Sequence, residues 1–161
     1  MTIVRTEGAQ RQSDERNRVV AEARKWIATP YHNCADVLGS GVDCGMLIVR
    51  VFVDSGMVEP FDPRPYAPDW MLHRDEEKYL AFFEERCAPV DAPGVGDIAL
   101  FHYGRTYSHG GIVVEADPVR IVHASHDARA VIEEGLTQNP VLTDPKRRLR
   151  FFSIWAKKVS G

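Results

Sequence analysis

Apolar residues recur at helical spacing in the first third of the chain and alternate at strand spacing in the second half. Two segments have one apolar face at helical spacing, 14–28 and 44–55, the latter ended by Gly56. Their inward residues are Val19, Val20, Ala23, Trp26 and Ile27, then Cys44, Leu47, Ile48, Val51 and Phe52. A third helix is predicted over 75–86, with Tyr79, Leu80 and Phe83 inward.

From residue 97 onward the pattern predicts five strands. They cover 97–103, 108–116, 120–125, 129–134 and 149–158, with Asp117-Pro118 as the turn between the second and third. Helices followed by antiparallel strands indicate an α+β fold, with N-terminal helices packed on a sheet of about five strands. We expect one catalytic domain over 1–161, with 1–12 loosely ordered and the proline-rich stretch 59–70 irregular.

Charge and composition exclude several classes of protein. The net charge of −3 offers no electrostatic attraction for nucleic acid or an anionic membrane, and no apolar stretch is long enough to span a bilayer. The N-terminal segment has no apolar core of a signal peptide, so we expect synthesis in the cytoplasm without one. Three cysteines, an odd number, then favour reduced thiols.

Cys44 has the position that best suits a nucleophile. It opens a predicted helix, and the partial positive charge and unpaired N–H groups of a helix N-terminus stabilise a thiolate. The same N–H groups can hold the oxyanion of a tetrahedral intermediate. Cys87 lies at the opposite end of its predicted helix, and Cys34 lies in a loop.

A cysteine nucleophile needs a histidine base, and that base needs an orienting group. His109 and His123 lie on consecutive predicted strands, 14 residues apart. A three-residue loop at 116–118 would place both rings on one face as diagonal neighbours. A loop of two or four residues would place them on opposite faces, and His126 then competes with His123 as the orienting residue.

Four motifs occur in order: GVDCGMLI (41–48), GDIALF (96–101), SHGGIVV (108–114) and IVHAS (121–125). Together they resemble the NlpC-type cell-wall cysteine peptidases, a papain-like group. The resemblance implies Cys44 as nucleophile, His109 as base and His123 as the orienting residue. It also implies that Tyr31 lies near the oxyanion and substrate, and that Asp43 binds the free amine of a short stem peptide.

Other residues near these motifs have open roles. Gly45 stands where the family usually has a serine, which puts one substrate contact in doubt. We expect Ser108, His32 and Trp70 to contact substrate, although His32 could merely cap its loop and Trp70 could anchor its own. The spacing of His32 and Cys34 does not match a closed zinc site, so no metal is expected. Lys146, Arg147 and Arg148 read as a solvated surface patch.

The resemblance therefore implies a cofactor-free thiol protease that hydrolyses an amide bond in the stem peptides of bacterial peptidoglycan. The segment PYAPDWMLHRDEEKYL (65–80) further resembles the branch found in phage tails and gene-transfer agents, which implies tail proteins as partners and the cell wall as the place of action. Two alternatives stay open: a non-catalytic tail-assembly module, and a thiol acyltransferase that uses the same residues.

Overall fold

The structure, a computed structural model, describes residues 2–64, 83–104 and 106–157. Its helices are α1 (Thr2–Lys25), α2 (Cys44–Asp54) and the short α4 (Pro140–Thr143), and residues 83–86 are also helical. Three 3-10 turns follow the last strands: η2 (Leu136–Gln138), η3 (Pro145–Arg147) and η4 (Ile154–Ala156). The other residues of the third predicted helix, and 65–70 of the proline-rich stretch, lie outside the described residues; 59–64 are irregular, as expected.

Six antiparallel strands form the main sheet, in the order β3-β8-β4-β5-β6-β7. They are β3 (Ala88–Val90), β4 (Ile98–Tyr103), β5 (Thr106–Ala116), β6 (Val119–Ser125), β7 (Ala130–Gly135) and β8 (Arg150–Ser153). Two short strands, β1 (Asp36–Val37) and β2 (Gly41–Val42), pair separately. The α+β prediction is confirmed, but the sheet has six strands instead of five. The additional strand, β3, is only three residues long, and Pro89 at its centre masks the strand pattern.

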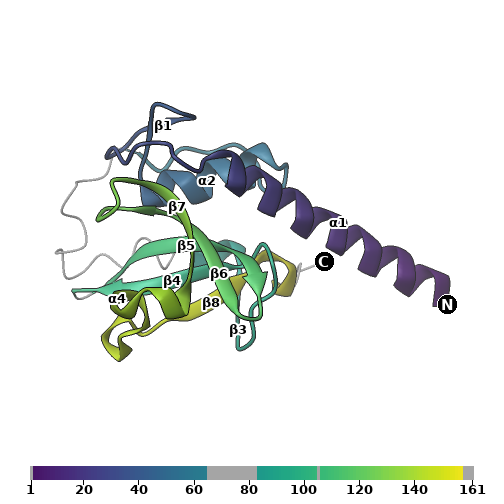
Figure 1. Cartoon of the computed structure of the whole chain (residues 1–161). Coiled ribbons are helices and arrows are strands. Elements are labelled where there is room, and N and C mark those ends of the chain that lie inside the picture. Colours follow the sequence, from purple (N-terminus) through teal and green to yellow (C-terminus); the bar gives the residue numbers. More distant parts are fainter. Residues whose placement is uncertain (1, 65–82, 105, 158–161) are drawn as a thin grey trace.

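The first helix begins far earlier than its predicted start at residue 14. Residues 2–12, expected to be loosely ordered, belong to α1, and Figure 1 shows this end of the helix reaching beyond the sheet. Residues 8–14 are exposed, so they carry no apolar stripe for the periodicity to detect. Polar pairs four residues apart support them instead, including Gln10 with Asp14 and Arg11 with Glu15.

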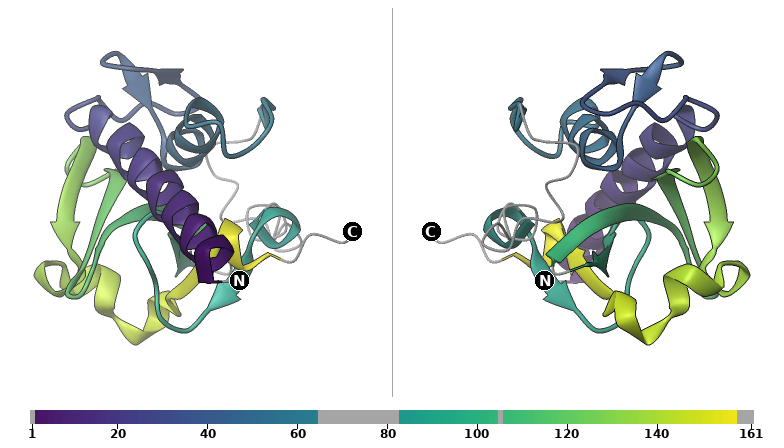
Figure 2. Two further views of the ribbon diagram at one scale, coloured as in Figure 1. Left: turned by 90° about the vertical axis from the view of Figure 1, so that its right-hand side faces the viewer. Right: turned by 90° about the vertical axis from the view of Figure 1, so that its left-hand side faces the viewer.

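The sheet separates two groups of buried side chains. Figures 1 and 2 show α1 and α2 together on one side, with α4 at the other end of the sheet. Ile98, Leu100, Ile112 and Val122 join the core beneath α1 and α2, which also contains the inward residues of both helices. The alternate strand residues Ala99, Phe101, Val113 and Ile121 pack with Leu136 and Leu142. This alternation is the period of two expected for strands buried on both faces.

A buried ion pair joins α1 to the start of β4. Arg16 Nη1 donates to Asp97 Oδ1 and to the Val95 carbonyl, both at 2.9 Å. Its guanidinium also lies 4.3 Å from the centre of the Trp155 ring. Asp97 is 2% exposed, so without this arginine a buried carboxylate would lose its cation.

Replacing Arg16 by methionine is expected to destabilise the fold by about 2 kcal/mol, because Asp97 would stay buried without its charged partner. Urea unfolding measures the change. Arg11→Met is the matched control: the side chain of Arg11 is 84% exposed beside Glu15, and its loss is expected to cost less than about 0.5 kcal/mol. Equal effects of the two substitutions would contradict a structural role for the buried pair.

Candidate active site

Asp43 builds the N-terminus of α2. Its backbone is extended, and Oδ1 accepts a hydrogen bond of 2.8 Å from the Met46 N–H. This is an N-cap, so Cys44 is the first helical residue, as the sequence predicts. The first N–H groups of a helix have no intrahelical acceptor, and the helix dipole places positive charge there. Cys44 therefore lies where a thiolate and an oxyanion are both stabilised.

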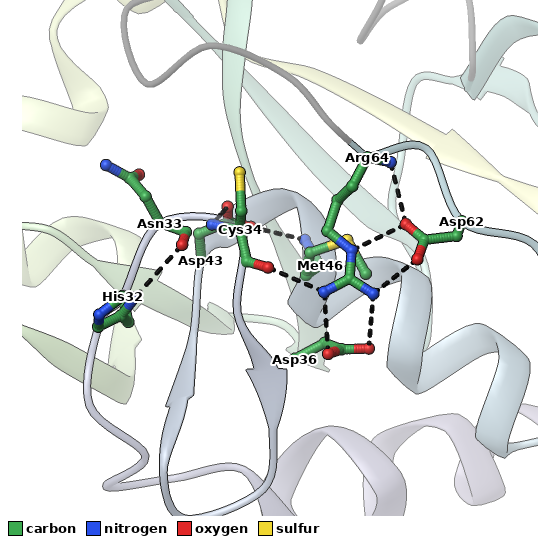
Figure 3. Close-up of polar contacts among 8 residues, drawn as sticks. All are labelled: His32, Asn33, Cys34, Asp36, Asp43, Met46, Asp62 and Arg64. Carbon is green, nitrogen blue, oxygen red and sulfur yellow. Dashed lines mark hydrogen bonds and ion pairs between the residues drawn. The ribbon is translucent and has the colours of Figure 1, made fainter.

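The loop before this helix is tied to it by charged side chains (Figure 3). The second oxygen of Asp43 accepts a hydrogen bond of 2.7 Å from the Cys34 N–H. Arg64 donates to the Cys34 carbonyl at 2.8 Å and forms ion pairs with Asp36 and Asp62. Cys34 has a φ of +60°, a conformation unusual for a non-glycine residue. These contacts fix both its backbone N–H and its carbonyl.

The thiol of Cys44 reaches the sheet. The residue is 8% exposed, and Sγ donates a 3.6 Å hydrogen bond to the carbonyl of Ser108, the residue before His109. Tyr103 lies against the His109 ring, with centroids 5.8 Å apart, and the nearby Cys44 contributes to raising the pKa of Tyr103 after the larger effect of burial. The nucleophile and base candidates therefore share one neighbourhood.

His109 and His123 lie side by side, but the hairpin that brings them together differs from the three-residue loop considered from the sequence. Ala116 pairs with Val119, so the hairpin loop has two residues, which alone would put the rings on opposite faces. The register shifts between Val113 and Glu115, where β5 contains one extra residue. That bulge reverses the alternation, and the two rings meet, with His109 Nε2 2.8 Å from His123 Nδ1.

A second irregularity in β5 lies beside the thiol. Phe101 pairs with His109 and His102 pairs with Tyr107, so Ser108 is an extra residue opposite β4. Its carbonyl receives the Cys44 thiol, and its own Oγ is buried with no hydrogen-bond partner among the described residues. β-bulges often redirect side chains beside active sites, which matches this location.

A carboxylate, that of Glu134, contacts the far side of the His123 ring from His109. His123 Nε2 lies 2.6 Å from Glu134 Oε2, on β7. Burial lowers the pKa of His123, and Glu134 opposes that effect by raising it. Burial also lowers the pKa of His109, with smaller contributions in the same direction from His123 and Arg147. Both rings are therefore neutral at pH 7 while the thiol keeps its proton.

The other predicted site residues lie in different surroundings. Tyr31 is half-buried, and burial raises the pKa of its hydroxyl, with the nearby Cys44, Asp43 and Cys34 adding to the rise. His32 is exposed, and its Nδ1 lies 3.2 Å from the Asn33 carbonyl. Asp43 is 3% exposed, with both oxygens accepting backbone N–H groups. Ser108 lies under the thiol as described above.

Two further residues, His126 and Trp70, are candidates for the site from the sequence. His126, the competitor for the orienting role, is exposed and contacts Tyr31 with ring centroids 5.2 Å apart. The structure thus places His123, and not His126, against His109. Trp70 lies outside the described residues.

Sequence reasoning missed Glu134 and Arg147. The sequence predicts that Arg147 belongs to a solvated patch, but the residue is half-buried, with its guanidinium 3.8 Å from the centre of the Tyr103 ring. Glu134 ends a strand among other acidic and polar residues and carries no local signal. Only the pairing of β6 with β7 could have indicated it.

Within the described part of the chain, no three His, Cys, Asp or Glu side chains gather closely enough to hold a metal ion. Likewise, no helix among the described residues has the length and apolarity needed to cross a membrane. The three cysteines form no disulfide with one another, and burial raises the pKa of Cys87 to about 12.

Comparison with solved structures finds the same architecture in two NlpC-type proteins and in an amidase. The NlpC/p60 domain of the peptidoglycan hydrolase SagA superposes with a TM-score of 0.54 at 18% identity, covering 84% of this chain and 96% of that domain. An N-acetylmuramoyl-L-alanine amidase from Bacteroides uniformis gives 0.55 at 14% identity, with 86% and 98% covered. NlpC1 from Trichomonas vaginalis gives 0.54 at 16% identity, with 79% of this chain and 41% of that one covered.

No protein-family model matches the chain, and no curated protein matches it. At these identities the superpositions establish the fold alone. The chain therefore has the α+β, papain-like fold of NlpC/p60 domains.

Proposed function

We propose that this chain is a cysteine peptidase that hydrolyses an amide bond in the peptide part of bacterial peptidoglycan. The observation that carries the proposal is the position of Cys44 at the N-terminus of α2, with its thiol against the residue that precedes the paired His109. The solved structures of similar fold include a peptidoglycan hydrolase and an N-acetylmuramoyl-L-alanine amidase, which supports the same substrate class.

In the proposed reaction, Cys44 Sγ attacks the carbonyl carbon of the scissile amide while His109 takes the thiol proton. The backbone N–H of Cys44 helps to hold the oxyanion. His109 then returns the proton to the leaving amine, and water hydrolyses the thioester to release the acid product. Because burial lowers the pKa of His109, the imidazolium keeps its proton only while the thiolate of Cys44 lies beside it.

The resemblance of the motifs favours the bond between γ-D-glutamate and the diamino acid. Incubation of the chain with purified peptidoglycan, followed by mass spectrometry of the products, tests this. The expected products carry a new γ-carboxyl on glutamate and a new amine on the diamino acid. Release of peptides that begin with L-alanine would instead identify an amidase.

The same digestion separates the two alternative functions. A chain that produces no new termini, and whose Cys44 is inert to iodoacetamide at pH 6, would be a docking module. Products joined to an added amine or lipid, in place of free acids, would identify an acyltransferase.

We also infer an association with phage tails or gene-transfer agents. This rests on segment 65–80 of the sequence, which lies outside the described residues. Mass spectrometry of phage or gene-transfer-agent particles purified from cells that express the chain would detect it as a component. Its absence from such particles, with activity retained, would remove the association and leave the hydrolase proposal intact.

A further inference from the structure

Glu134 occupies a position that no motif indicates. It lies on β7, where Ile132 pairs with His123, so Glu134 follows two residues later on the same face. Its Oε2 lies 2.6 Å from His123 Nε2, and its side chain is 17% exposed. Its neighbour Glu133 points to the opposite face, where it forms ion pairs with Arg24 and Arg120.

Asn139 holds this carboxylate in place. Its Oδ1 accepts from the backbone N–H groups of Val141 and Leu142, as the N-cap of α4. Because the oxygen is used in this cap, the amide nitrogen is directed elsewhere, and Nδ2 donates to Glu134 Oε2 at 3.2 Å. Both contacts of the carboxylate, with Asn139 Nδ2 and with the His123 ring, thus reach the same oxygen, Oε2.

The polarity of these hydrogen bonds determines where protons lie on the two rings. An ionised carboxylate only accepts, so the neutral His123 must carry its proton on Nε2 and present a lone pair at Nδ1. His109 Nε2 faces that lone pair at 2.8 Å and must therefore be the donor. A neutral His109 then has its lone pair on Nδ1, which has no hydrogen-bond partner among the described residues.

We propose that Glu134 is a positioning residue, which sets the tautomers of His123 and His109 so that Nδ1 of His109 is unprotonated and able to accept the Cys44 proton. This rests on the proposed peptidase function. Through the hydrogen bonds that link Glu134, His123 and His109, the negative carboxylate stabilises the positive charge that His109 acquires with the thiol proton. The site is thus a nucleophile, a base and two successive orienting groups.

Other ionisable groups lie around the hydrogen-bonded series of Glu134, His123 and His109. Arg147 of η3 acts on His109 directly, and Tyr103 of β4 lies against its ring. Cys44 and Asp127 raise the pKa of Tyr103 in turn. Arg147 opposes a positive charge on His109, whereas the carboxylates favour it. Removal of one carboxylate is therefore expected to shift the ring toward its neutral form.

The test compares Glu134→Gln with the wild-type chain by the rate at which iodoacetamide alkylates Cys44 at pH 6. Cleavage before Asp36 and Asp43 separates the Cys44 peptide from the Cys34 peptide, which serves as the internal reference thiol. Glutamine keeps the shape but removes the charge, and its amide can donate to His123 and reverse both tautomers. We expect alkylation and kcat/KM to fall by about 10- to 100-fold.

The pH profile gives a readout that a purely structural role would not move. Without the carboxylate, the His109 imidazolium loses its proton more readily, so the acid limb of kcat/KM, where the base becomes protonated, should move to lower pH. Glu134→Asp retains a carboxylate and is expected to restore part of the profile. Glu133→Gln is the matched control. Glu133 lies on the same strand but faces the other side of the sheet, so its replacement should leave the profile unchanged.

Nitrogen-15 spectra of the histidine rings test the tautomers without any turnover. We expect both rings to be protonated at Nε2 in the wild-type chain and an Nδ1-protonated population to appear in Glu134→Gln. A wild-type His123 protonated at Nδ1, or an unchanged pH profile in Glu134→Gln, would overturn the role of Glu134. If Cys44 reacts no faster than Cys34 in the wild-type chain, the peptidase proposal fails instead, and the spectra still decide the tautomers.

Discussion

The Cys44→Ala variant is expected to lose peptidoglycan hydrolysis by about 1,000-fold or more, because the covalent pathway needs the thiol itself. The fold should remain, since Asp43 caps α2 through the Met46 N–H and makes no use of the side chain of Cys44. Removal of one sulfur from a site at the edge of the core is expected to change the free energy of unfolding by about 1 kcal/mol. Release of soluble muropeptides measures activity, and urea unfolding measures stability.

Cys87→Ala is the matched control for this variant. Cys87 is 3% exposed, and burial and the nearby Asp97 raise the pKa of its thiol to about 12, so it is no nucleophile at neutral pH. Its replacement should keep full activity at a similar cost in stability. Hydrolysis that survives in Cys44→Ala, with the same new termini, would remove Cys44 from the reaction.

The second large effect is expected at Gly111, which lies on β5 two residues after His109. A Cβ added there would lie 3.0 Å from His123 Cβ and 3.1 Å from the Val122 carbonyl oxygen. Neither atom is the end of a flexible side chain, so His123 and its strand would have to move. The shift required is a few tenths of an ångström, less than the displacement of about 1 Å that can cost about 100-fold in rate, so Gly111→Ala is expected to lower kcat by about 10-fold.

Gly135→Ala supplies the comparison, because it places the same methyl group on a strand of the same sheet. There the nearest atoms belong to the side chains of Gln138 and Arg120, which can turn away. We expect Gly135→Ala to retain its activity. If Gly111→Ala matches the wild-type kcat, with a Tm unchanged or raised, the close approach of His123 does not control the reaction.

Much of this arrangement could be predicted from the sequence, because the signals are local. The apolar stripe that begins at Cys44 marks α2 and places the thiol at its first turn. The Asp117-Pro118 pair marks the hairpin that brings β5 and β6 together. The two histidines could therefore be assigned to neighbouring strands before any coordinates were known.

The relations that sequence could not supply are those between distant segments or those that depend on one residue of register. The bulge between Val113 and Glu115 leaves no mark in a run of β-branched residues. Glu134 meets His123 only because β7 pairs with β6, and the strand pattern of β7 says nothing about its partner. Arg147 reaches Tyr103 from the far end of the chain.

The extra residue of β5 between Val113 and Glu115 makes the meeting of His109 and His123 depend on an exact number of residues in the hairpin. The strand carries Ser108 unpaired toward β4 and an additional residue near Val114 toward β6, and each reverses the alternation of faces once. Loss or gain of a single amino acid between His109 and His123 would turn one imidazole away from the other, even where the hydrophobic character is preserved. Natural length variation in this hairpin should therefore come in steps of two, or should be confined to the segment around Gly104 that precedes it.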